Sequence, residues 1–257
     1  MRTRRQQLFS KVPEITVYFW IVKVLSTAMG EATSDYLVYA MNHYVAVALG
    51  AIGLVVSLVL QFSVRRYVAW IYWLVVCMVA IFGTMVADVA HIVLGIPYAV
   101  SSIAFAIILA IVFLCWYAAE RTLSIHSIFT RRREVFYWAT VLATFALGTA
   151  TGDMTARTLN LGYLTSGLLF AVLFALPALA YWLFGLNEIF AFWFAYVMTR
   201  LLGASFADWF GMPQSVGGLG YPRAWISLVL TIFIVIFVAY LAKTRKDVQE
   251  RPSDSAE

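Results

Sequence analysis

Four aspartates recur at equivalent positions inside apolar stretches of this sequence. Each follows a glycine by five residues and a tryptophan by fifteen, so the pattern W-x9-G-x4-D occurs four times. The copies are Trp20, Gly30 and Asp35; Trp73, Gly83 and Asp88; Trp138, Gly148 and Asp153; and Trp193, Gly203 and Asp208. A carboxylate inside a membrane is costly unless it is paired or hydrated. Carboxylates that share one level also repel one another, which favours a bound proton or cation. The repeated aspartates therefore predict an ion- or proton-binding site.

The copies differ in the charged residues that surround this pattern. Glu31 adds a fifth acid, and His91 follows Asp88 by three residues, a spacing that places both on one helix face. We assign Glu31 and His91 to the same site. Lys23 and Arg200 are cations inside apolar stretches and are predicted counter-charges. Each lies more than about 10 Å along its own helix from the motif aspartate, so its partner must come from another helix.

The atoms around these acids indicate which ligand the site would bind. Hydroxyl-bearing residues lie close to the acids in the sequence, at Thr33, Ser34, Thr84, Thr149 and Thr151. Carboxylate and hydroxyl oxygens suit protons or hard cations. The pattern specifies no cofactor beyond a candidate divalent cation of the Mg²⁺ or Mn²⁺ type, with the four motif aspartates as its ligands. No zinc motif of the CxxC or HExxH kind and no Walker motif is present.

Each part of the repeated pattern also has a structural interpretation, which the sequence leaves open. The tryptophans could form an aromatic belt at the membrane interface or a layer of rings that closes the inner end as a gate. The glycines could permit close helix packing or a local kink. The aspartates could lie at the outer interface, bonded to nearby backbone, instead of converging on one site.

The elements that position these residues are predicted to be membrane helices. The chain has 257 residues, of which 63% are hydrophobic and 12% are charged, whereas a soluble domain has roughly half and a quarter. This composition excludes a soluble enzyme or a nucleic-acid-binding protein. Continuous apolar runs, each long enough to span a bilayer, predict an all-α polytopic membrane protein with eight transmembrane helices.

Basic residues predict the orientation of this chain. Of the 18 Lys and Arg residues, 14 flank alternate loops and the two ends, so the positive-inside rule places both termini in the cytoplasm. The predicted segments are an N-terminal segment over 1–12, repeats over 13–66, 67–120, 134–186 and 187–243, a cytoplasmic connector over 121–133 and a disordered cytoplasmic tail over 244–257.

Each repeat contains two spans, so the four repeats must point the same way across the membrane. The expected arrangement is pseudo-fourfold or two-by-two, about an axis along the membrane normal, and not the inverted repeat of many transporters. The four motif helices should lie inside. The four other helices carry almost no interior charge and should face lipid.

The fourfold pattern resembles that of bacterial integral membrane proteins made of four tandem DUF347 repeats. Those repeats each contain two membrane helices and a characteristic tryptophan, which Trp20, Trp73, Trp138 and Trp193 match one per repeat. The resemblance covers roughly 13–243 and implies an architecture and a multi-pass location in the bacterial inner membrane. It implies no chemistry.

The favoured function is a membrane transporter or channel for a metal ion or small cationic solute, or a proton-coupled one. The intramembrane aspartates would bind the cargo or the proton. A receptor or structural partner protein is the alternative, and an intramembrane enzyme is disfavoured because catalysis usually needs unlike groups. The expected partners are the lipid bilayer and a small cation or solute, with no nucleic acid, and a homodimer is left open.

Overall fold

A computed structural model describes residues 10–248 as a bundle of long helices with no strand in this range. Short 3-10 and π-helical turns connect or extend these helices. The eight long helices are α1 (Val17–Ala40), α2 (His43–Ser63), α3 (Ala69–Asp88), α4 (Tyr98–Glu120), α5 (Arg131–Asp153), α6 (Tyr163–Phe184), α7 (Glu188–Gly211) and α8 (Arg223–Thr244). Most of the predicted N-terminal segment (1–9) and of the predicted tail (249–257) lies outside the described residues.

Local sequence explains where several of these helices begin. Side-chain oxygens of Thr16, Asn42, Thr130 and Asn187 accept a hydrogen bond from a backbone N–H in the first turn of α1, α2, α5 and α7. Such caps satisfy backbone donors that have no partner inside the helix. α4 and α8 instead begin directly after a proline, whose fixed φ is compatible with helix entry.

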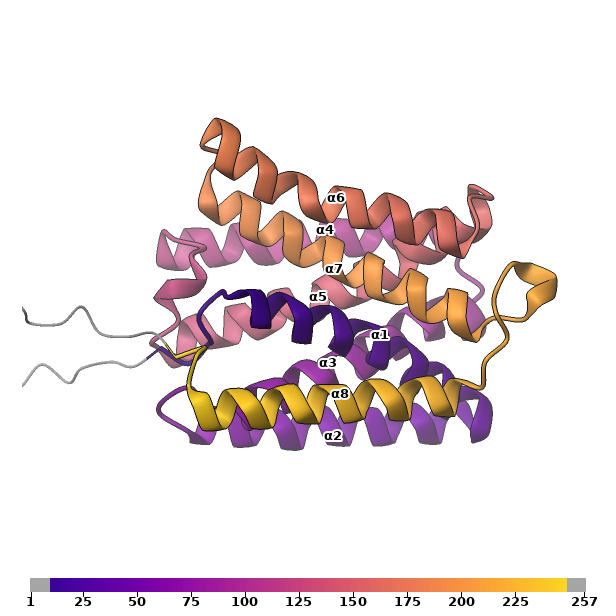
Figure 1. Ribbon diagram of the computed structural model, residues 1–257, viewed down its shortest axis with the longest axis horizontal. Coiled ribbons are helices and arrows are strands. Elements are labelled where there is room, and N and C mark those ends of the chain that lie inside the picture. Colours follow the sequence, from indigo (N-terminus) through magenta and orange to yellow (C-terminus); the bar gives the residue numbers. More distant parts are fainter. Residues whose placement is uncertain (1–9, 249–257) are drawn as a thin grey trace, which may run out of the picture.

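The four motif helices lie inside the bundle and the other four cover them. α1, α3, α5 and α7 pack in a ring, each against the next and α7 against α1. The most apolar stretches of α3, α5 and α7 are 56% to 67% buried, against 11% to 28% for α2, α4, α6 and α8. In Figure 1, α4 and α6 lie on one side of the ring and α2 and α8 on the other. This confirms the predicted division into inner and outer helices.

The four outer helices also pack in a cyclic order around the ring. α2 packs mainly on α3, α4 on α5, α6 on α7 and α8 on α1. Each outer helix therefore packs chiefly against the inner helix of the following repeat and not against its own. The bundle is held together by contacts between repeats.

Seven of the long helices in residues 10–248 are long and apolar enough to cross a membrane, which indicates a multi-pass membrane protein. α1 is not among them, although the sequence predicted it as a span. It carries Lys23, Glu31 and Asp35 along its length, and these charges lower its hydropathy. α1 nevertheless packs in the ring against α3, α7 and α8.

The motif glycines mark where the inner helices touch. An added Cβ at Gly30 would collide with Ala80, and one at Gly83 would collide with Phe145. The same holds for Gly148 against Arg200 and for Gly203 against Thr27. In every case the neighbour is the residue three before the glycine of the following repeat. These contacts identify close packing as the role of the glycines.

The two ends of the described chain meet at one end of the bundle, on the left in Figure 1. The Glu14 N–H donates to the Asp247 carbonyl at 2.8 Å, the Tyr67 N–H to Ser10 at 2.9 Å, and the Lys11 N–H to Ile128 at 3.1 Å. The basic loops predicted to face the cytoplasm thus share this end. The start of the predicted disordered tail is folded here, because Asp247 is buried.

Candidate functional site: a layer of buried carboxylates and a central arginine

Two of the motif aspartates form ion pairs with arginines. The Arg223 Nε at the start of α8 lies 2.8 Å from an Asp35 oxygen. The Arg157 Nε lies 3.3 Å from an Asp153 oxygen, one helical turn before it. Arg157 also donates to the hydroxyls of Tyr163 and Tyr98, each at 2.9 Å. Asp35 and Asp153 are therefore neutralised.

The other two motif aspartates have no ion pair in the part of the chain that the structure describes. Asp88 accepts a long hydrogen bond of 3.4 Å from the Ser34 hydroxyl, and Asp208 is buried, with 7% of its surface exposed. Each motif glycine meets the following inner helix at the same offset, so the aspartates five residues after the glycines lie at similar heights in the bundle. We call the four motif aspartates the carboxylate layer.

This layer is more open than a metal site. Among residues 10–248, no three His, Cys, Asp or Glu residues stand close enough to hold a metal ion. The predicted divalent-cation site on the four aspartates consequently gains no support from their spacing. Within the described residues, the aspartates do not form a compact ligand cage.

A fully buried arginine lies at the centre of the ring. The Arg200 Nη2 donates to the Glu31 carboxylate and to the hydroxyls of Thr84 and Thr149. Nη1 donates to the Thr27 carbonyl at 3.4 Å. Arg200 on α7 thus joins all four inner helices. Its ion-pair partner is Glu31, on another helix.

The acceptors of this arginine follow the repeat. Glu31, Thr84 and Thr149 each directly follow the motif glycine, and Ala204 occupies that position in the fourth copy. The residue after the glycine therefore points to the ring centre in at least three copies. Three copies supply an oxygen, and the fourth helix supplies the guanidinium.

Lys23 is not paired with an acid. Its side chain is fully buried, and its Nζ has no hydrogen-bond partner among the described residues. The ammonium instead lies 4.2 Å from the ring centres of both Phe145 and Tyr196. No carboxylate of another helix pairs with it among the described residues, and its counter-charge role therefore receives no support.

Replacing Lys23 with methionine is expected to stabilise the protein by roughly 1 kcal/mol or more, because a buried ammonium without hydrogen bonds loses its hydration and gains little in return. The melting temperature of the purified protein in detergent measures this effect. Lys246→Met, at an exposed position, is the control and should leave it unchanged. A fall of several degrees in Lys23→Met would mean that the aromatic rings stabilise the ammonium more than its burial costs.

The motif tryptophans pack inside the bundle in a collar of aromatic rings. Trp73, Trp138 and Trp193 are buried, and Trp20 is half-buried. The residue before each tryptophan is also aromatic, and it contacts the tryptophan of the following repeat. The pairs, with their ring-centre distances, are Phe19–Trp73 (5.7 Å), Tyr72–Trp138 (5.4 Å), Tyr137–Trp193 (6.1 Å) and Phe192–Trp20 (5.8 Å). This geometry favours the ring layer over an interfacial belt.

Sequence reasoning overlooked these four preceding aromatics. Their signal was present, because an aromatic residue stands directly before the tryptophan in every copy. Tyr72 and Tyr137 also share a hydroxyl–hydroxyl hydrogen bond of 2.5 Å. The collar lies near the starts of the four inner helices.

His91 does not join Asp88 as predicted. A π-helical turn, η1 (Val89–Val93), begins directly after Asp88, and its wider winding removes the three-residue α-helical register on which the prediction depended. The His91 Nδ1 lies 3.0 Å from the Ile96 carbonyl, and Nε2 lies 3.4 Å from the Ser101 hydroxyl. His91 thus fastens the loop to α4. A second π turn, η3 (Met154–Thr158), follows Asp153 in the same way.

Comparison with known proteins agrees with the repeat seen in the sequence and in the packing. No curated protein and no solved structure is detectably similar to the chain. The family model described as Repeat of Unknown Function (DUF347) matches four times, over residues 18–67, 71–122, 136–186 and 191–247. These matches cover most of the sequence, and each contains one copy of the W-x9-G-x4-D pattern. The chain therefore belongs to the DUF347 repeat family.

Proposed function

We propose that this protein is a proton-coupled membrane transporter of a small cation or cationic solute, in which Asp88 and Asp208 carry the exchangeable protons. One observation supports it above the others. The buried acids Glu31, Asp35, Asp88, Asp153 and Asp208 outnumber their arginine partners by two, because only Arg200, Arg223 and Arg157 pair with them. Two carboxylates thus have no arginine partner, and a carboxylate in a membrane is costly unless it is protonated, hydrated or balanced by a cation.

The proposal includes an orientation. The four repeats would lie parallel about a pseudo-fourfold axis, with all eight long helices crossing a bacterial inner membrane and both termini in the cytoplasm. The shared basic end of the bundle supports this, since positive loops favour the cytoplasmic side. The carboxylate layer would then face the opposite side and receive the cargo from there.

The packing of the ring favours a carrier over an open channel. Below the carboxylate layer, the Arg200–Glu31 pair occupies the ring centre, and the aromatic collar follows it. Passage of a cation would require these layers to move. Movement of inner helices against each other, with protons replacing the cargo on Asp88 and Asp208, is the mechanism that the geometry supports best.

Asp88→Asn and Asp208→Asn are expected to reduce transport by at least ten-fold, because each removes one exchangeable charge. The measurement is the charge movement across proteoliposomes on a solid support when they are exposed to Na⁺, K⁺, Mg²⁺, Mn²⁺ or small organic cations at several pH values. Glu188→Gln is the matched control. Its carboxylate lies outside the carboxylate layer and 64% of its side chain is exposed, so transport should be unchanged.

Infrared spectroscopy provides a second measurement that needs no knowledge of the cargo. A protonated buried carboxyl gives a C=O stretching band at a higher wavenumber than the bands of an ionised carboxylate. We expect wild-type protein to lose such a band as the pH is raised, and each single variant to lose part of it. The absence of any titrating carboxyl band would contradict the proton-carrying role. If the two Asp→Asn variants had lower melting temperatures but unchanged transport per folded molecule, the aspartates would have a structural role, as in the alternative of a receptor or structural partner protein.

A further inference from the structure

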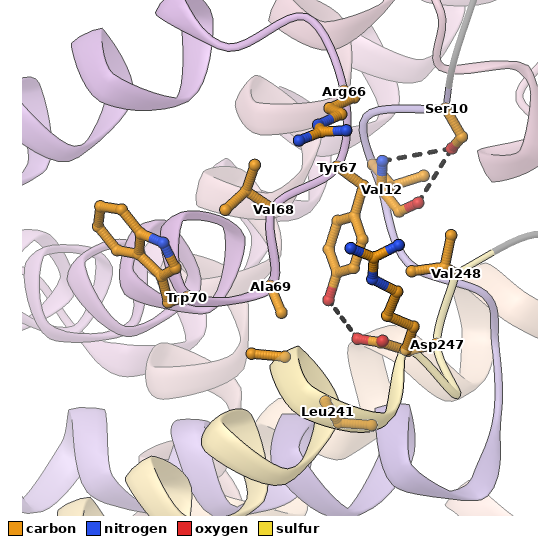
Figure 2. A pocket seen from close by; sticks show the side chains of 12 residues that line it. Ser10, Val12, Arg66, Tyr67, Val68, Ala69, Trp70, Leu241, Asp247 and Val248 are labelled. Atoms are coloured by element: carbon orange, nitrogen blue, oxygen red, sulfur yellow. Dashed lines mark hydrogen bonds between the residues drawn. The ribbon is translucent and has the colours of Figure 1, made fainter.

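A cavity with polar and apolar lining lies at the basic end of the bundle, on the opposite side of the ring centre from the carboxylate layer. It has a volume of about 450 Å³ and is formed by the start of α3, the end of α8 and the segment before α1. Figure 2 shows Tyr67 and Asp247 meeting across it, with Arg66 and Trp70 on the α3 side. α3 and α8 are both candidate spans, so their ends lie at the depth of lipid head groups.

Two arginines give this cavity phosphate-binding groups. Arg66 and Arg245 both line it, and both are exposed. Arg245 ends α8 in a left-handed conformation with φ 55°, which is uncommon for a residue other than glycine. Its N–H donates to the Leu241 carbonyl at 2.8 Å. Arginine is well suited to phosphate because its planar fork of donors matches the phosphate oxygens.

An aspartate gives the same cavity an unused acceptor. Asp247 lines it with only 1% of its surface exposed. Its Oδ2 accepts a hydrogen bond of 2.5 Å from the Tyr67 hydroxyl, while Oδ1 has no partner among the described residues. Burial raises the pKa of Asp247 above its usual range. A buried acceptor without a donor is costly, and a cation with N–H groups would offset that cost.

Apolar surface continues from these charges toward the membrane. Trp70 is 53% exposed beside the cavity, at the height where tryptophan lies in membrane interfaces. Val68, Ala69, Leu241 and Ala242 complete this side of the lining. The cavity therefore combines donors for a phosphate, an acceptor for an ammonium and an apolar wall for an acyl chain.

We propose that this cavity binds the head group of phosphatidylethanolamine, with the phosphate on Arg66 and Arg245, the ammonium on Asp247 and an acyl chain along Trp70. Charge complementarity selects this occupant. Phosphatidylglycerol has a phosphate but no amine, and the choline group of phosphatidylcholine has no N–H to donate to Asp247. The cavity is lined by the segment before α1, by the start of α3 and by the end of α8. A lipid bound there would contact all three and so would also stabilise the fold.

Native mass spectrometry of the delipidated protein with each of the three lipids tests this proposal. We expect wild-type protein to bind phosphatidylethanolamine at least five-fold more tightly than phosphatidylcholine or phosphatidylglycerol. Asp247→Asn should remove this preference, and the double variant Arg66→Gln, Arg245→Gln should weaken binding of all three at least five-fold. Arg65→Gln is the matched control, since the neighbouring Arg65 does not line the cavity, and its binding should equal that of wild type.

Two outcomes would overturn the proposal. Equal binding of the three lipids by wild-type protein removes the basis for the ammonium contact. This comparison uses the wild-type protein alone, so it does not require any variant to fold. Soluble phosphoethanolamine distinguishes the lipid from a free phosphate compound: we expect it to bind at least ten-fold more weakly than the lipid, and equal binding would exclude the acyl-chain wall. The carboxylate layer takes no part in either measurement.

Discussion

Glu31→Gln is expected to destabilise the protein by about 3–5 kcal/mol, because removing one partner of a buried ion pair leaves the other charge uncompensated. Arg200 has no exposed surface and cannot reach water without opening the ring. Its remaining partners are the hydroxyls of Thr84 and Thr149 and the Thr27 carbonyl, which carry no full charge. Chemical or thermal unfolding in detergent would measure the loss.

A double-mutant cycle separates this pair from a general loss of packing. Arg200→Met alone should also destabilise, since it leaves the Glu31 carboxylate without its cation. Glu31→Gln combined with Arg200→Met should recover much of the stability, because the pair's desolvation cost disappears with both charges. Losses that simply add in the double variant would show that the two residues act independently and would contradict the central role of the pair.

Gly203→Ala is expected to destabilise by about 3 kcal/mol, at the upper end of the cost of overpacking a close-packed site. The new methyl group would collide with the side chain of Thr27 and with the backbone nitrogen of Ala28. A backbone atom cannot rotate away, so α1 and α7 would have to separate. That separation would also pull Arg200 on α7 away from Glu31 on α1.

Gly152→Ala is the matched control for this substitution. Gly152 lies in α5, another inner helix, but an added Cβ would meet no atom within 4 Å. Alanine favours the helix over glycine by about 0.5–1 kcal/mol, so this variant should be neutral or slightly more stable. Equal melting temperatures for the two alanine variants would contradict the close approach of α1 and α7 at Gly203.

The repeat register made much of this fold predictable. Because tryptophan, glycine and aspartate recur at constant spacing, the sequence alone predicted which helices carry the site and which cover them. The family match confirms the four repeats, and the burial of α3, α5 and α7 agrees with their place inside the bundle. The level of the carboxylate layer also followed, since equal spacing along parallel helices places equivalent residues at equal heights.

The partners of individual residues could not be predicted in the same way. Arg200 was unpaired along α7, and its partner Glu31 became identifiable only when the cyclic order of the helices placed α7 beside α1. The separation of Asp88 from His91 depended on a π turn, which has no reliable sequence signal. Whether an aspartate is paired or unpaired depended on Arg157 and Arg223. Both lie in loops or at helix ends, and in the sequence they served only to predict the orientation of the chain in the membrane.

The cyclic packing has a consequence for how the chain assembles during synthesis. The inner helix α1, which carries Lys23, Glu31 and Asp35, is made before α7 and α8, yet it packs against both of them. Glu31 and Arg200 are separated by 169 residues, so the acid enters the membrane long before its counter-charge exists. The ring cannot close before α7 is made, and until then α1 depends on water, a proton or the translocation machinery to accommodate its carboxylates.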